Sequence, residues 1–115
     1  MKNFALLFRM DISPASRPSP EQMKMYMNNW MDWINEIQDS GKLVSGNHFS
    51  AEGTVIKPGQ VTESAPFRSD GVSVAGYIII EAEDLDETLI TARKCPILNG
   101  ENTSVEIRAL AVPGI

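Results

Sequence analysis

Residues 19–41, SPEQMKMYMNNWMDWINEIQDSG, decide the fold because they predict one long amphipathic helix. Ser19 suits the N-cap, Pro20 suits the first helical position, and Gln22 follows the cap by three residues, as a capping box requires. Gly41 is a typical C-terminal stop. Apolar residues recur at spacings of three and four and form one stripe: Met23, Met27, Trp30, Ile34 and Ile37, widened by Tyr26 and Trp33. The stripe predicts that the helix packs against an apolar layer.

Strands are predicted on both sides of this helix. Residues 2–10 form an apolar strand that ends at the proline-rich connector 11–20. Residues 43–49 form the next strand, and residues 75–82 form a strand that is apolar on both faces. Residues 104–112 alternate between apolar and polar side chains and predict the last strand.

A hairpin is predicted between the second and third of these strands. Residues 54–56 and 61–63 flank the sequence Lys57-Pro58-Gly59-Gln60. Proline followed by glycine at the two central positions is typical of a type II turn. Residues 64–73 predict no regular structure.

A second helix is predicted to begin at the N-cap Asp84 and to end before Pro96. Glu87 follows the cap by three residues, in the capping-box position. Its inward-facing residues are expected to be Leu85, Leu89 and Ala92.

The order of elements predicts a single α+β domain over residues 1–115. Strand, helix, strand, strand, helix, strand, with the hairpin inserted, is typical of a ferredoxin-like βαββαβ fold. In such a fold the sheet is antiparallel and both helices cover one face.

Alternation along the strands divides each of them between two sheet faces. One face is wholly apolar and is expected to lie under the helices: Phe4, Leu6, Phe8 and Met10; Ile78, Ile80 and Ala82; Val105, Ile107, Ala109 and Ala111. The other mixes apolar and charged side chains: Leu7, Tyr77, Ile79 and Leu110 with Arg9, Glu81, Glu106 and Arg108. That mixture favours a second subunit packed sheet to sheet, with a semi-polar cavity between the layers. The alternative is an ion-pair network at the rim of the sheet.

Composition excludes several classes of partner and site. Ten basic against fifteen acidic residues give a net charge of −5, which argues against a nucleic-acid or anionic-membrane partner. No apolar run approaches the roughly 20 residues of a membrane span. A single Cys (Cys95) excludes an internal disulfide and favours a cytoplasmic location. No phosphate loop, nucleophile elbow or metal-ligand spacing occurs, so neither a cofactor nor a metal is expected.

Few side chains are candidates for proton transfer. His48 is the one histidine, and its ordinary pKa lies near neutrality. It is expected at the end of a strand, where Asp70 or Glu63 would be its carboxylate partner. The alternative for His48 is a solvated position at the strand end. Cys95 precedes Pro96 at a helix terminus and is expected to be buried and unreactive.

The chain resembles the YCII-related family, also labelled by its Asp-Gly-Pro-Phe motif, over about residues 1–112. The matching segments occur in the family's order: Phe4-Ala5-Leu6-Leu7-Phe8, Gly41-Lys42-Leu43-Val44-Ser45-Gly46, Gly76-Tyr77-Ile78-Ile79, Ala92-Arg93-Lys94-Cys95-Pro96 and Val105-Glu106-Ile107-Arg108-Ala109-Leu110. The motif itself reads Ser64-Ala65-Pro66-Phe67, and the polar residues that follow it in the family are replaced by Ser69 and Gly71-Val72. Either an activity has been lost or the motif was structural.

The resemblance implies a homodimer in which two ferredoxin-like protomers form an α+β barrel. Two functions are then open. In the first, the protein binds a small, anionic ligand between the sheet and its dimer partner without catalysis, through residues expected to be Arg9, Ser64, Phe67, Tyr77 and Arg108. In the second, it is a cofactor-free enzyme of the lactone-isomerase or dehalogenase type, with His48 or Asp70 as the catalytic residue that moves a proton.

Overall fold

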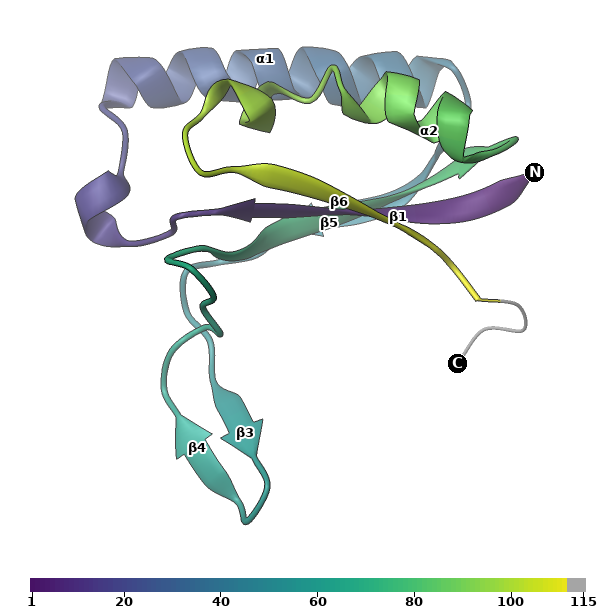
Figure 1. The fold of residues 1–115 in the computed structure, drawn as a ribbon. Helices are drawn as coiled ribbons and strands as arrows, with labels where there is room; N and C mark the ends of the chain where they lie inside the picture. Colours follow the sequence, from purple (N-terminus) through teal and green to yellow (C-terminus); the bar gives the residue numbers. More distant parts are fainter. Residues whose placement is uncertain (112–115) are drawn as a thin grey trace.

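The computed structural model of the chain describes residues 1–111. The last strand, predicted over residues 104–112, ends at Ala109, and residue 112 lies outside the described range. Two layers are formed, with both helices on one face of a sheet (Figure 1). In chain order the elements are β1 (Lys2–Met10), a 3-10 turn (Pro14–Ser16), α1 (Pro20–Asp39), β2 (Leu43–His48), β3 (Val55–Lys57), β4 (Val61–Glu63), β5 (Ser73–Ala82), α2 (Leu85–Ala92), a 3-10 turn (Pro96–Asn99) and β6 (Ser104–Ala109).

The main sheet has four strands in the order β2-β5-β1-β6, and every neighbouring pair is antiparallel. This arrangement is α+β and compatible with a ferredoxin-like fold, as the order of elements predicts. β1 is a central strand, paired with β5 on one side and β6 on the other. β5 begins at Ser73, two residues earlier than the alternation predicts.

The predicted cap of α1 is present in full. The Ser19 hydroxyl accepts a hydrogen bond from the backbone N–H of Gln22, and the Gln22 side chain accepts one from the backbone N–H of Ser19. Such a cap stabilises a helix by about 1 kcal/mol, because it satisfies N–H groups that have no partner within the helix. At the other end Gly41 has φ +76°, the left-handed conformation that terminates helices.

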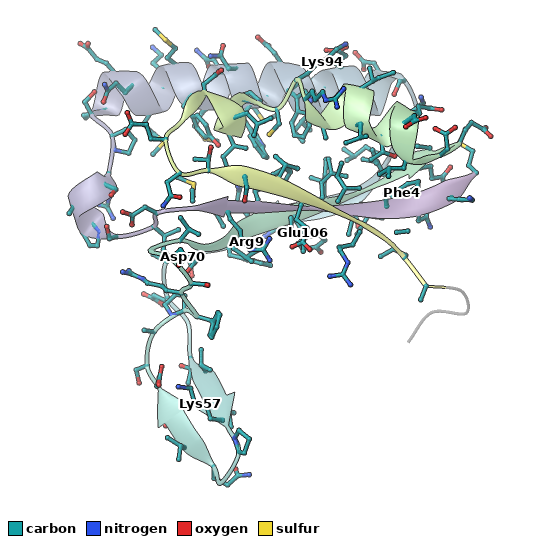
Figure 2. All side chains as sticks on the ribbon, viewed as in Figure 1. Phe4, Arg9, Lys57, Asp70, Lys94 and Glu106 are labelled. Carbon is teal, nitrogen blue, oxygen red and sulfur yellow. The ribbon has the colours of Figure 1, made fainter. Side chains whose placement is uncertain are left out.

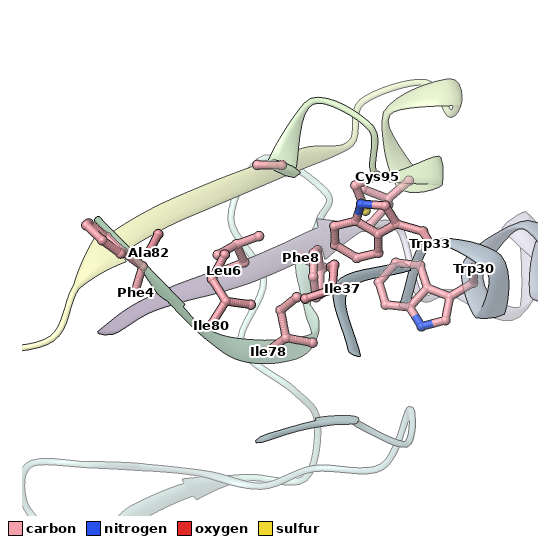
Figure 3. Close-up of a cluster of buried hydrophobic side chains, with 12 residues drawn as sticks. Phe4, Leu6, Phe8, Trp30, Trp33, Ile37, Ile78, Ile80, Ala82 and Cys95 are labelled. Carbon is pink, nitrogen blue, oxygen red and sulfur yellow. The ribbon is translucent and has the colours of Figure 1, made fainter. Parts of the chain in front are cut away.

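The core lies between the sheet and α1 and consists mainly of aromatic and branched side chains (Figure 3): Phe4, Leu6, Phe8, Trp30, Trp33, Ile37, Ile78, Ile80, Ala82, Ala92, Cys95 and Ile97. The ring of Phe8 meets Trp30 and Trp33 edge to face, at centroid distances of 4.9 and 5.9 Å. Trp33 also joins the two helices, because its Nε1–H donates to the carbonyl of Thr91 at 3.1 Å. Each such ring stabilises the fold by about 2–3 kcal/mol through burial alone.

The N-terminal half of the predicted α1 stripe is wrong as a core assignment. Met23 and Met27 are exposed by more than a third, whereas Trp30, Trp33 and Ile37 are buried. The two methionines line an open cavity of about 340 Å³ instead of packing in the core.

Three further predictions about packing are wrong in detail. Leu85 is exposed rather than buried, because it is the first residue of α2 and the short helix buries Thr88 and Ala92 instead. Glu87 does not close a capping box, since its carboxylate accepts from the N–H of Glu83 and from Lys42. Ala109 and Ala111 are exposed, because the end of the last strand extends past the helices.

Residues 50–72, which we call the arm, leave the sheet between β2 and β5 and carry the predicted hairpin of β3 and β4 (Figure 1). The turn contains Gly59 at φ +83°, as a type II turn requires, followed by Gln60 at φ +65°. The arm extends away from both helices, on the side of the uncovered sheet face.

Candidate functional site

The uncovered face of the sheet carries two rows of side chains that run across all four strands. The first row contains Asn47, Tyr77, Leu7 and Glu106, and the second contains Ser45, Ile79, Ala5 and Arg108. In these two rows the apolar side chains lie on the central strands β5 and β1, and the charged ones lie on β6 at one edge. The predicted division of the strands between two faces holds for these residues.

A cluster of three charges occupies the β6 side of this face. Arg9 Nη1 donates to Glu106 Oε1 at 2.6 Å, and Arg108 Nη1 donates to Glu106 Oε2 at 3.4 Å. Figure 2 shows Arg9 and Glu106 on the side of the sheet opposite the helices. The predicted rim network is thus present, and two of its members, Arg9 and Arg108, are also predicted ligand residues.

The cluster has an unequal distribution of charge. Hydrogen bonding from Arg9 is the main reason that the pKa of Glu106 lies below its ordinary value, so the carboxylate is ionised at neutral pH. Two guanidinium groups then share one carboxylate. The Arg108 side chain is 68% exposed and makes only the longer contact. Because a guanidinium has five N–H donors, most of those on Arg108 have no partner among residues 1–111 and can bind an anionic group.

An aromatic pair borders the apolar part of the same face. The rings of Phe49 and Tyr77 are 5.8 Å apart, and Tyr77 lies beside Leu7 in the adjacent strand. Asn47 pairs with Tyr77 on the other side. Phe49 and Asn47 are not among the residues that the sequence predicts at the site. Asn47 could have been identified from the alternation of β2, because it lies two residues from Ser45 and so points to the same face.

The segment that follows the hairpin is held at the start of β5. The hydroxyl of Ser73, which is buried, donates to the carbonyl of Phe67. Ser69 and Val72 exchange backbone hydrogen bonds at 3.0 and 3.1 Å around the pair Asp70-Gly71. Ser64 and Phe67 are both exposed, and the Phe67 ring is 69% exposed. Of the predicted ligand residues, Arg9, Tyr77 and Arg108 share one face, whereas Ser64 and Phe67 lie in the arm.

His48 lies on the helix side of the sheet. His48 is exposed at the end of β2, its ring is 5.0 Å from that of Trp30, and it borders two open cavities of about 230 and 340 Å³ on this side of the sheet. Both cavities are mainly apolar, with Met27 and Trp30 in each. Within residues 1–111 no hydrogen bond joins the imidazole to another group.

Asp70 lies elsewhere, at the tip of the turn between Phe67 and β5. Both Asp70 and Gly71 have positive φ, +55° and +80°, as a tight Asp-Gly turn requires. The carbonyl of Asp70 accepts a hydrogen bond from Asn102 at 3.3 Å. Neither cavity beside His48 includes Asp70, Glu63 or an arginine. Both candidate proton-transfer residues are therefore without the partner that the sequence-based hypothesis gives them.

Cys95 is buried, as predicted. Burial raises the pKa of its thiol to about 12, so the group stays protonated and packs as a small apolar side chain. Within the described part of the chain, no three His, Cys, Asp or Glu side chains are close enough to bind a metal ion. Over the same residues, neither helix is both long and apolar enough to cross a membrane.

Neither protein-family models nor curated proteins give a match to this chain. No protein-family model matches the chain. No curated protein is similar to it at a significant level. The resemblance to the YCII-related family therefore stays a prediction.

Proposed function

We propose that this chain is a ferredoxin-like, YCII-related protein that forms a homodimer through its uncovered sheet face and binds a small anionic ligand between the two sheets, without catalysis of its own. The uncovered face, apolar in its centre and charged on one side, carries the proposal. A cytoplasmic location belongs to the same proposal.

The surface of one chain is large for a protein of this size, which supports a partner. The accessible surface is 8119 Å², against about 6,200 Å² for a compact monomer of 12.7 kDa. The radius of gyration is 15.5 Å, against about 13 Å for a compact domain of this length. A standard interface buries about 800 Å² per partner, which is less than the excess surface.

The charges on the face suit a copy of the same face. In a two-fold interface each patch meets itself, so a patch must contain both signs of charge. Arg9 and Arg108 supply the positive groups, and Glu81 and Glu106 supply the negative ones. Leu7, Tyr77 and Ile79 would form the apolar centre, and each is already half-buried.

The ligand class follows from the same groups. Within residues 1–111 Arg108 has unpaired donors beside the single carboxylate of the cluster, and Tyr77 offers a flat ring on the same face, two strands from Glu106. A guanidinium binds carboxylates in a bidentate manner. We therefore expect a small carboxylate with an apolar body.

The dimer is tested by sedimentation velocity from low to high micromolar protein. A species of twice 12.7 kDa is expected, and a clean 12.7 kDa species at the highest concentration would contradict the proposal. Ile79→Lys is expected to give monomer. Ile90→Lys, which changes an exposed isoleucine on α2, is the matched control and is expected to stay dimeric.

The ligand is tested by thermal shift with benzoate, hexanoate and γ-butyrolactone. A carboxylate at a hundredfold excess over its Kd stabilises the fold by about 2.7 kcal/mol, which raises Tm by about 10 °C. Arg108→Ala should remove the shift, whereas Arg93→Ala, at the end of α2, should keep it. No shift with any carboxylate would contradict anion binding, and a shift with the lactone alone would favour a neutral ligand.

A further inference from the structure

The arm has no core of its own. No side chain of β3 or β4 is buried, and Ile56 and Val61 are 68% and 55% exposed. The hairpin is held by a three-residue ladder and by the exposed ion pair between Lys57 and Glu63, at 2.6 Å. A two-stranded hairpin is at best marginally stable in water, and an exposed ion pair adds little. Within residues 1–111 the hairpin therefore has no surface against which its side chains are buried.

The root of the arm fixes its direction. The N–H of Phe49 donates to the carbonyl of Ala75 at 2.9 Å, which continues the pairing of β2 and β5 into the arm. The two legs then approach closely, since a side chain at Gly53 would lie 3.2 Å from Pro66. From this root the arm extends on the side of the uncovered sheet face, away from both helices (Figures 1 and 2).

The length of the arm exceeds the separation of two packed sheets. The eight residues from the start of the arm to the end of β3, residues 50–57, span up to about 26 Å at about 3.3 Å per residue. Two sheets packed face to face lie only about 10 Å apart. A second copy on the uncovered face would therefore lie beside the arm. The arm and the face are two unpartnered surfaces that border the same space.

We propose that the arm clasps a second copy of this chain, with Ile56 packed against the flank of the partner and Val61 on the opposite face of the hairpin. This inference rests on the dimer proposed above. Two-fold symmetry gives each protomer one arm to extend and one to receive, so the clasp closes on itself without leading to fibres. A second copy is favoured over an unrelated protein because the arm begins at the edge of the self-complementary face.

The proposal is tested by hydrogen exchange of residues 55–63 at protein concentrations above and below the dissociation constant of the dimer. The clasp predicts protected amides in the dimer and rapid exchange in the monomer, because the isolated hairpin opens readily. Rapid exchange of these amides in a stable dimer would overturn the clasp and leave the dimer intact. Absence of any dimer would overturn both proposals.

A substitution gives an independent measurement. Ile56→Ser removes one apolar contact from each of the two arms. It is expected to raise the dissociation constant of the dimer by about tenfold or more. Ile90→Ser is the matched control, because Ile90 is 62% exposed and lies on α2. Equal dissociation constants for the two variants would count against the clasp. Loss of the fold is excluded by comparing the circular dichroism of each variant with that of the parent.

Discussion

Ile78 and Ile79 are neighbours on β5 whose side chains point to opposite faces of the sheet, and truncating each to alanine separates the two faces experimentally. Ile78 is buried between Leu6 and Gly46 in the adjacent strands, under α1. Ile78→Ala leaves a cavity in a packed core and is expected to lower the free energy of unfolding by about 3–4 kcal/mol. Ile79 lies half-buried on the uncovered face, so Ile79→Ala should cost only about 1 kcal/mol in an isolated protomer.

The assay is urea unfolding of both variants at a low and a high protein concentration. The decrease in the free energy of unfolding caused by Ile78→Ala should be the same at both protein concentrations, because the cavity lies within one protomer. The loss in Ile79→Ala should grow with concentration, because a second copy stabilises the parent by mass action. Equal losses for the two variants at the low concentration would refute the assignment of the faces. A concentration-independent loss in Ile79→Ala would refute packing of a second copy on this face.

Three further outcomes follow from single groups. Gly46→Ala is expected to lower the free energy of unfolding by about 1–3 kcal/mol or to displace β2, because a Cβ there would lie 2.7 Å from the Ile78 side chain and 2.8 Å from the Tyr77 carbonyl. A free energy of unfolding equal to that of the parent would contradict this close approach of the two strands. Glu106→Gln should lower the free energy of unfolding at neutral pH. The difference from the parent should shrink as the pH falls below 4.5, the ordinary pKa of a glutamate, and through the lowered pKa of the folded state, because the ion pair is lost when Glu106 is protonated. Urea unfolding from pH 3 to 7 measures this difference, and a difference that does not change with pH would be inconsistent with the ion pair. Cys95 should react with a thiol reagent only as fast as the protein unfolds, because its thiol is buried with a pKa raised to about 12, and stoichiometric labelling of the native protein within minutes would disprove this.

The sequence predicts those features that depend on neighbouring residues. Ser19 and Gln22 define the start of α1 because their hydrogen bonds span only three residues. Alternation separates Leu6 from Leu7 and Ile78 from Ile79 correctly, because successive side chains on a strand point to opposite faces.

The errors arise where tertiary cover decides burial. Met23 and Leu85 have the right spacing for a core position, but each lies near the start of its helix and is 40% and 50% exposed, respectively. Ala109 is likewise in phase with the buried side of β6 and projects past the helices. Helical or strand periodicity gives the direction of a side chain and not the extent of the layer that covers it.

The candidate site shows the same limit. Alternation places Arg9, Tyr77 and Arg108 on one face, and the strand pairing brings Arg9 to Glu106 across 97 residues of sequence. His48 and Asp70 are both near the end of a predicted strand or loop, so the sequence allows them to meet. Their separation depends on the path of the arm between them, which no local pattern predicts.

The place of β1 in the sheet has a consequence for how the chain folds. β1 is central and precedes the other described strands in the chain, and its two partners, β5 and β6, begin only at Ser73 and Ser104. Until those residues have left the ribosome, Phe4, Leu6 and Phe8 have no sheet to join. Pairing between such distant segments slows folding, because the chain loses the entropy of loop closure before the stabilising contacts between the strands form. A nascent chain that stops before β6 would present β1 as an open, apolar edge, so its aggregation should depend on whether synthesis has passed residue 109.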